Sequence, residues 1–240
     1  MLPKDINLQL PPTDLPETDR HFLLYIPWQE KYLDSIPRDF KKYFLDCSPL
    51  LSVRTTDVHT ATCFSYFDQL IYAYENNHNL KINRLVVGLA LILHDTGWSQ
   101  LSQSEIAASL GISGLKLNTI ASAPKEKHAV EGEIIARQKL TSWEIPPDET
   151  NLICQCVRWH DKPQQVSQDG HVPPEVKLVV DLDHLWAFTH LNFWQDTVRK
   201  GISPEEYAAN LDTDLEGYFV TQEGKAIAKE LLEQRKKEIS

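Results

Sequence analysis

Glycine and methionine are scarce in this chain, which has 9 glycines and 1 methionine among 240 residues. So few glycines disfavour an all-β sandwich with many tight turns. Nowhere do about 18 uncharged apolar residues follow one another, the length that a membrane-spanning helix requires, and the first residues contain no apolar segment typical of a signal peptide. We therefore expect a cytoplasmic protein with no membrane partner.

Positive charge is also in short supply, because 24 Lys and Arg face 34 Asp and Glu, for a net charge of −10. Binding to the phosphate backbone of DNA or RNA requires basic residues gathered on one face, so we expect no nucleic-acid partner. Residues 101–113 resemble the helix and glycine turn of a DNA-binding helix-turn-helix, but no basic recognition helix follows in 114–123. We interpret this segment as a surface insertion of unassigned role.

The chain contains only four cysteines, Cys47, Cys63, Cys154 and Cys156. The last two form a C-x-C pair, which on a helix points the sulfurs about 200° apart and cannot form a zinc knuckle of the CxxC type. A chain of this length buries roughly 70% of its unfolded surface and needs no disulfide for stability. We expect all four cysteines to be reduced core residues.

Helical periodicity is the main pattern in the sequence. Apolar residues recur at three- and four-residue spacing in residues 57–75, 83–94, 103–110, 125–140, 148–160, 174–192, 203–219 and 222–237. Strand-like alternation is confined to short stretches, and residues 1–19 hold four prolines, which favours an extended arm. We predict an all-α protein with an N-terminal arm over 1–19 and a single helical domain over 20–240.

Four histidines fall on the apolar stripes of their predicted helices: His59, His94, His128 and His160. Asp95 follows His94, and Asp183 lies three and four residues after two valines. A single inward histidine is most often a core residue bonded to a carbonyl. Burying all six without partners would cost about 1–3 kcal/mol each, against a total stability of about 5–15 kcal/mol. A shared divalent cation would remove this cost, because imidazole and carboxylate are its natural ligands.

The order of these residues, His59, His94-Asp95, His128, His160 and Asp183, resembles the HD superfamily of metal-dependent phosphohydrolases. The segment Leu91–Gly97, LILHDTG, is similar to that family's apolar-HD-x-Gly helix end. The segment Val179–Leu185, VVDLDHL, is similar to its final aspartate helix. The resemblance covers about residues 54–195 and implies an HD-domain helical bundle, with the C-terminal helices packed on it.

The resemblance also implies a ligand set. The principal metal would bind His59, His94, Asp95 and Asp183. Asp181 is an alternative last ligand, and the two valines that precede Asp183 on its face favour Asp183. We expect the remaining histidines to be non-ligands: His21, His78, His171, His184 and His190.

His128 and His160 match positions that bind a second metal in binuclear members or contact phosphate in mononuclear ones. Catalytic roles would fall to Asp95, His128 and His160. Mixed histidine and carboxylate ligation suits Mn, Fe, Co, Ni or Zn better than magnesium. We therefore expect one or two divalent transition-metal ions.

One position departs from the family pattern, because Trp98 stands where many members have a lysine after HD-x-Gly. A substrate phosphate must then meet other cations. Those near the motifs are Arg54, Lys125, Lys127, Arg158 and Lys162. Of these we predict Lys127 and Arg158 as substrate-binding residues.

The activity implied by the resemblance is hydrolysis of a phosphate ester, on a nucleotide or another small phosphorylated metabolite, through metal-activated water. Two alternatives stay open. One is a di-iron oxygenase or a hydratase of the same fold that acts on a nonphosphate small molecule. The other is a regulatory module that binds a nucleotide without turnover. The sequence also leaves open the metal and whether the chain forms a homo-oligomer.

Overall fold

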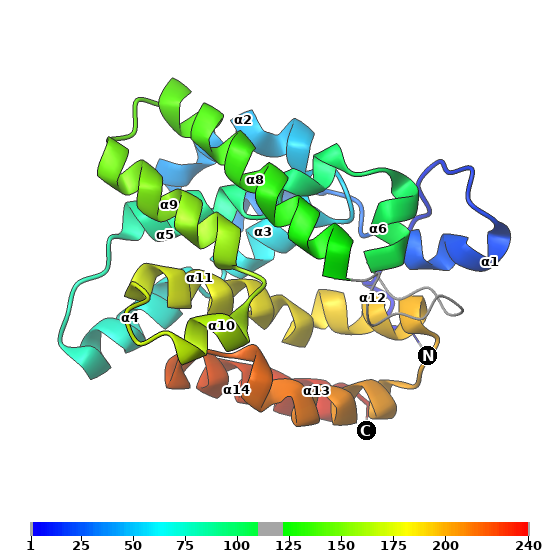
Figure 1. The fold of residues 1–240 in the computed structure, drawn as a ribbon. Helices are drawn as coiled ribbons and strands as arrows, with labels where there is room; N and C mark the ends of the chain where they lie inside the picture. The colour runs from blue at the N-terminus through cyan, green and yellow to red at the C-terminus, as the bar shows by residue number, and fades with distance from the viewer. Residues whose placement is uncertain (1, 110–121, 240) are drawn as a thin grey trace.

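The computed structural model describes residues 2–109 and 122–239 (Figure 1). Over these residues the all-α class is confirmed, because the regular structure consists of helices and one isolated bridge between Gln9 and Tyr25. No helix in the described part of the chain is both long enough and apolar enough to cross a bilayer.

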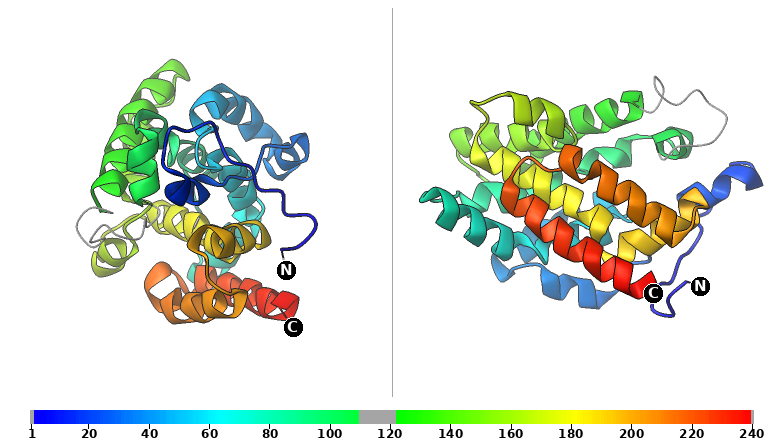
Figure 2. Two further views of the ribbon diagram at one scale, coloured as in Figure 1. Left: turned by 90° about the vertical axis from the view of Figure 1, so that its right-hand side faces the viewer. Right: turned by 90° about the horizontal axis from the view of Figure 1, so that it is seen from below.

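Short connections join the helices, with η marking a 3₁₀ helix. Before the gap they are α1 (Glu17–Arg20), η1 (His21–Leu23), η2 (Glu30–Ser35), α2 (Arg38–Leu51), α3 (Thr56–Phe64), α4 (Phe67–His78), α5 (Arg84–Leu93), η3 (Thr96–Gln100) and α6 (Gln103–Ser109). After it they are α8 (Ser122–Ser142), α9 (Pro147–Trp159), α10 (Pro163–Gln168), α11 (Pro174–Leu185), η4 (Trp186–Phe188), α12 (His190–Lys200), α13 (Pro204–Tyr218) and α14 (Gln222–Ile239). Helices α2, α8 and α9 lie on one side of the molecule and α13 and α14 on the other, with α11 and α12 between them (Figure 1, Figure 2).

Helix α5 is central because its sequence provides no polar face. Every residue from Val86 to Leu93 is buried, and the side chain of Asn83 caps the helix start by accepting from the Val86 N–H at 3.3 Å. A helix that is apolar all round must be surrounded by other elements, and α2, α3, α9 and α11 pack against this one. The residues that follow its C-terminal end, His94 and Asp95, therefore lie deep inside the protein.

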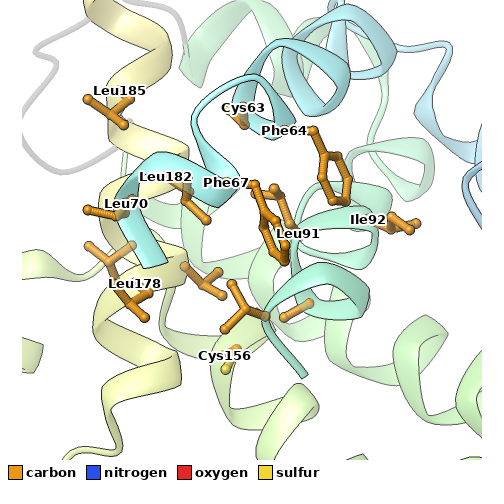
Figure 3. Close-up of a cluster of buried hydrophobic side chains, with 14 of the residues drawn as sticks. Cys63, Phe64, Phe67, Leu70, Leu91, Ile92, Cys156, Leu178, Leu182 and Leu185 are labelled. Carbon is orange, nitrogen blue, oxygen red and sulfur yellow. The ribbon is translucent and has the colours of Figure 1, made fainter. Parts of the chain in front are cut away.

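The hydrophobic core lies where α3, α4, α5 and α11 meet. Figure 3 shows side chains from these helices, among them Phe67, Leu91 and Leu182, pointing toward one another. All three are essentially inaccessible to solvent. The four cysteines are also buried free thiols, as the sequence predicts.

Two predicted helices are each divided in the structure. The stretch 57–75 breaks between α3 and α4, where the Ser65 and Tyr66 N–H groups bond three residues back. The stretch 174–192 breaks at η4, because Thr189 caps a new helix by accepting from the Asn192 N–H at 3.4 Å.

Helix α2 lies outside the predicted segments, although a signal for it is present. Phe40, Phe44, Cys47 and Leu51 recur at helical spacing and form its buried face. Helix α6 covers only residues 103–109, and the glycine turn interpreted at 111–113 lies outside the described residues.

Residues 2–16, most of the predicted arm, contain no helix and lie against the body of the protein. Ile6 is buried in the main core. His190 Nε2 lies 3.0 Å from Asp5 Oδ2, and its Nδ1 lies 2.9 Å from Glu238 Oε2. These contacts tie the arm to α12 and to the end of α14.

A close backbone approach fixes the turn after α5. A Cβ added at Gly97 would lie 1.9 Å from the carbonyl oxygen of His128 and 2.5 Å from the backbone nitrogen of Gly132. A Cβ at Gly132 would lie 3.3 Å from the carbonyl oxygen of His94. Only glycine at position 97 therefore lets the turn that carries His94 and Asp95 lie directly against α8.

We predict that Gly97→Ala lowers the free energy of unfolding by at least about 1–3 kcal/mol, because the new methyl group collides with backbone that cannot move aside cheaply. Urea denaturation of wild type and variant measures this difference. Gly170→Ala is the matched control, since its Cβ would meet nothing within 4 Å. Equal denaturation midpoints for Gly97→Ala and wild type would contradict the close approach.

Candidate metal centre

The six predicted metal ligands converge from five helices. His59 lies in α3, His94 and Asp95 follow α5, His128 lies in α8, His160 follows α9, and Asp183 lies in α11. Five of them are buried, His94 completely, and the Asp183 side chain is 12% exposed. Residues far apart in sequence thus form one cluster of buried donors.

The first donor group surrounds one oxygen of Asp183. His59 Nε2 lies 3.1 Å and His94 Nε2 lies 3.5 Å from Asp183 Oδ1. Asp95 Oδ2 completes the group, 3.1 Å from His59 Nδ1 and 3.6 Å from His94 Nε2.

Neither histidine nitrogen that faces Asp183 has a hydrogen-bond partner. His94 Nδ1 donates to the Leu91 carbonyl at 2.7 Å, so neutral His94 carries its lone pair on Nε2. That lone pair faces a carboxylate oxygen. Two electron-pair donors repel at this separation unless a proton or a metal cation lies between them, and one metal ion bound to both atoms would meet this need.

The second donor group faces the other oxygen of Asp95. His128 Nε2 lies 3.6 Å and His160 Nε2 lies 3.7 Å from Asp95 Oδ1, and the two imidazole nitrogens are 3.0 Å apart. His160 Nδ1 donates to the Val157 carbonyl at 2.7 Å, so the neutral imidazole of His160 carries its lone pair on Nε2. Asp95 therefore lies between two groups of donors and presents one oxygen to each.

The separations between donors fit transition-metal coordination. Bonds of about 2.0–2.1 Å to histidine nitrogen place neighbouring ligands about 3.0 Å apart at right angles and about 3.4 Å apart in a tetrahedron. The contacts within the two groups run from 3.0 to 3.7 Å. The ligand atoms of His59, His94 and Asp95 lie close enough together to hold an ion, as do those of Asp95, His128 and His160. The mixture of imidazole and carboxylate suits the transition metals expected from the sequence.

The carboxylates of the cluster are ionised at neutral pH. Burial acts to raise the pKa of Asp95, but His94, His160 and His59 hold that pKa well below its ordinary value. In the other direction, burial opposes protonation of His160, yet Asp95 and Asp183 raise its pKa to about 9. The cluster thus favours positive charge, which protons or a divalent cation can supply.

Trp98 holds two of the ligands in place. Its indole N–H donates to Asp95 Oδ1 at 2.9 Å, and its ring stacks on His128 with centroids 4.1 Å apart and an interplanar angle of 11°. Contacts of this kind fix ligand orientation around a metal. Trp98 therefore helps to orient Asp95 and His128.

Asp183, not Asp181, faces the histidines. Asp181 is fully buried and accepts from the Val220 N–H at 2.7 Å and the Thr221 N–H at 3.0 Å. Burial raises the pKa of Asp181 to about 6, although these bonds oppose the rise. Asp181 thus joins α11 to the start of α14 and lies on the far side of its helix from the donor groups.

The donor groups open into a cavity of about 520 Å³. The cations in its lining are Arg54, Lys125, Lys162 and Arg199. The first three belong to the set named from sequence. Arg199 lies in the last turn of α12, away from the motifs, so no spacing signal identifies it.

The structure does not bring Lys127 and Arg158 into this lining. Lys127 Nζ lies 2.8 Å from Glu105 Oε1 on α6, and Arg158 bonds to Glu126 on α8. Both predicted substrate-binding residues are therefore held outside the cavity by acidic partners.

His184, expected to be a non-ligand, lies in the cavity lining. Its Nε2 is 3.8 Å from Asp161 Oδ1. Together with Asp183, these two residues form a third, more exposed group whose donor atoms are close enough to hold an ion.

Comparisons with known proteins do not assign a family to the chain. No family model matches it, and neither the curated proteins nor the solved structures give a significant match. Its chemistry must therefore be inferred from the geometry of the site.

We predict that His94→Ala and Asp95→Ala each abolish metal binding, because each removes a donor at the centre of the first group. Metal content of the purified, folded variants, measured by elemental analysis, tests this. His171→Ala, at an exposed position away from the cavity, is the control and keeps the wild-type content. Full stoichiometric metal in folded Asp95→Ala would rule out the assignment.

A second variant separates one metal ion from two. If His128 and His160 bind an ion of their own, their joint replacement by alanine lowers the metal content from two equivalents to one, since His59 and Asp183 still hold the first. One equivalent in wild type, unchanged by the double replacement, would instead assign these histidines to substrate contact.

Proposed function

We propose that this protein is a metal-dependent phosphohydrolase of the HD type that acts on a nucleotide or another small phosphorylated metabolite. The observation that carries the proposal is the pair of donor groups that share Asp95 and open into the cavity. A divalent cation at such a site supplies a water nucleophile at neutral pH and stabilises negative charge on a phosphoryl oxygen.

Residues of the chain account for the rest of the chemistry. Asp95 stays ionised and is oriented by the Trp98 N–H, so its two oxygens keep fixed directions. The hydrogen bond that His160 Nδ1 donates to the Val157 carbonyl orients the His160 ring. We assign Asp95, His128 and His160 to the side of the cluster at which the phosphoryl group reacts.

The size and charge of the cavity support a small anionic substrate. A volume of about 520 Å³ lies in the range of pockets for small molecules. Four cations line the cavity together with the carboxylates of Asp95, Asp161, Asp183 and Asp196, so cationic donors are present where a phosphate would bind. The overall negative field disfavours long nucleic acids.

A second candidate is an oxygenase or hydratase that acts on a nonphosphate molecule. The observation that favours it is again Asp95, because a carboxylate shared by two histidine groups also suits a pair of iron ions. Arg54, a cation of the lining without an ion-pair partner among the described residues, favours the phosphohydrolase, since a neutral substrate needs no such group.

We predict that the purified protein hydrolyses a small phosphomonoester in a saturable, metal-dependent reaction. A panel of phosphomonoesters assayed with Mn, Fe, Co, Ni and Zn tests this, with release of inorganic phosphate as the measurement. A chelator removes the activity and a transition metal restores it, whereas Asp95→Ala stays inactive with any metal. Iron-dependent turnover of a phosphate-free substrate, with none on any monoester, would favour the oxygenase or hydratase, and tight nucleotide binding without turnover would favour the regulatory module.

A further inference from the structure

The cations that line the cavity differ in their partners. Three of them face acids: Lys125 Nζ lies 3.2 Å from Asp161, Lys162 Nζ lies 2.8 Å from Glu126, and Arg199 Nη1 lies 3.7 Å from Asp196. Arg54 forms no ion pair with any carboxylate of the described residues, and its Nε has no hydrogen-bond partner. No carboxylate therefore occupies its donor groups, although Asp95, Asp161, Asp183 and Asp196 attract its charge through space.

An aromatic ring, not an acid, holds the Arg54 side chain. The guanidinium carbon lies over Trp98, 4.0 Å from the ring centroid. This contact stabilises a cation and leaves the N–H groups at the edge of the guanidinium free to donate. Because Trp98 also bonds to Asp95 and stacks on His128, the Arg54 charge lies beside the donor groups.

The backbone that carries Arg54 is strained. Arg54 and Thr55 both have left-handed φ, at 56° and 72°, a conformation that β-branched threonine rarely adopts. Two bonds hold it, because Thr55 Oγ1 accepts from the Ile26 N–H at 3.1 Å and from Gln195 Nε2 at 3.0 Å. Strain of this kind persists where surrounding contacts enforce it and is concentrated at functional sites.

We propose that Arg54 binds the phosphoryl group of the substrate and that the Arg54–Thr55 turn positions it. The inference rests on the proposed function and deepens it. A guanidinium offers two parallel N–H donors to phosphate oxygens. Since Arg54 is the one cavity cation of the described residues without an acidic partner, the cavity matches a single phosphoryl group. The substrate class is then a phosphomonoester rather than a diphosphate or triphosphate.

The first test is binding of inorganic phosphate to the protein as purified, measured by titration calorimetry. Arg54→Gln weakens phosphate binding by about 10- to 150-fold, the loss expected when a charge-assisted hydrogen bond is removed. Arg54→Lys restores it only in part, because an ammonium cannot donate two parallel bonds. Lys127→Gln, which removes the same charge outside the cavity, keeps the wild-type affinity. Equal affinities for wild type and Arg54→Gln would overturn the proposal.

The substrate class is tested with nucleoside mono-, di- and triphosphates as ligands of the same proteins. We expect wild type to bind the diphosphate and the triphosphate less than tenfold more tightly than the monophosphate. Arg54→Gln lowers the affinity for all three ligands by a similar factor. A triphosphate that binds tenfold or more tightly than the monophosphate, and does so equally in Arg54→Gln, would overturn the assignment.

The positioning role of Thr55 has its own pair of variants. Thr55→Ala removes the hydroxyl that accepts both bonds, and it weakens phosphate binding at unchanged metal content. Thr55→Ser keeps the hydroxyl and restores the affinity. Should Thr55→Ala not fold, Gln195→Met removes one of the two donors and is expected to weaken phosphate binding in the same direction. Wild-type affinity in a folded Thr55→Ala, or no rescue by serine, would overturn this role.

Failure of this inference is distinguishable from failure of the proposed function. Monoester hydrolysis by wild type, with phosphate affinity unchanged in Arg54→Gln, would remove the Arg54 site and leave the phosphohydrolase. Phosphate binding that depends on Arg54, without hydrolysis of any monoester, would support the site and remove the phosphohydrolase.

Discussion

The buried, ionised carboxylate of Asp95 is the constraint on which the rest of the site depends. One of its oxygens faces His59 and His94, and the other faces His128 and His160. An ionised carboxylate in a protein interior is tolerated only with close partners of opposite charge or with hydrogen-bond donors. The helices that surround α5 supply these partners. Asp95 lies in the interior because it follows directly after α5, whose residues from Val86 to Leu93 are all buried.

Two helix ends present their histidines in the same way. His94 follows α5 and His160 follows α9, and in each the Nδ1 donates at 2.7 Å to a carbonyl three residues earlier, that of Leu91 or Val157. The bond satisfies a carbonyl left unpaired at a helix end, selects the tautomer and aims Nε2 into the cluster. The same local hydrogen bond thus orients one histidine in each donor group, and it explains why both histidines lie at the ends of helices.

Periodicity predicts which histidines and aspartates lie close together, but not which cations line the cavity. The apolar residues of a helix mark the face that points inward, and this face distinguishes Asp183 from Asp181 on α11. Lys127 and Arg158 are near ligands only in sequence. Lys127 precedes His128 on α8 and points about 100° away from it, and Arg158, two residues before His160, points about 200° away from that histidine. Arg199 reaches the cavity because α12 packs beside it, and no spacing in the sequence indicates this tertiary contact.

Trp98 links the site to a distant part of the chain. Its ring provides a surface on which the Arg54 guanidinium lies. The conformation of Arg54 depends on Thr55, which Ile26 and Gln195 hold from outside the motif. The segment after the N-terminal arm and helix α12 therefore help to determine where positive charge lies in the cavity. The anion site proposed at Arg54 thus depends on several separate parts of the fold, whereas the histidines and aspartates of the donor groups lie in or directly after α3, α5, α8, α9 and α11.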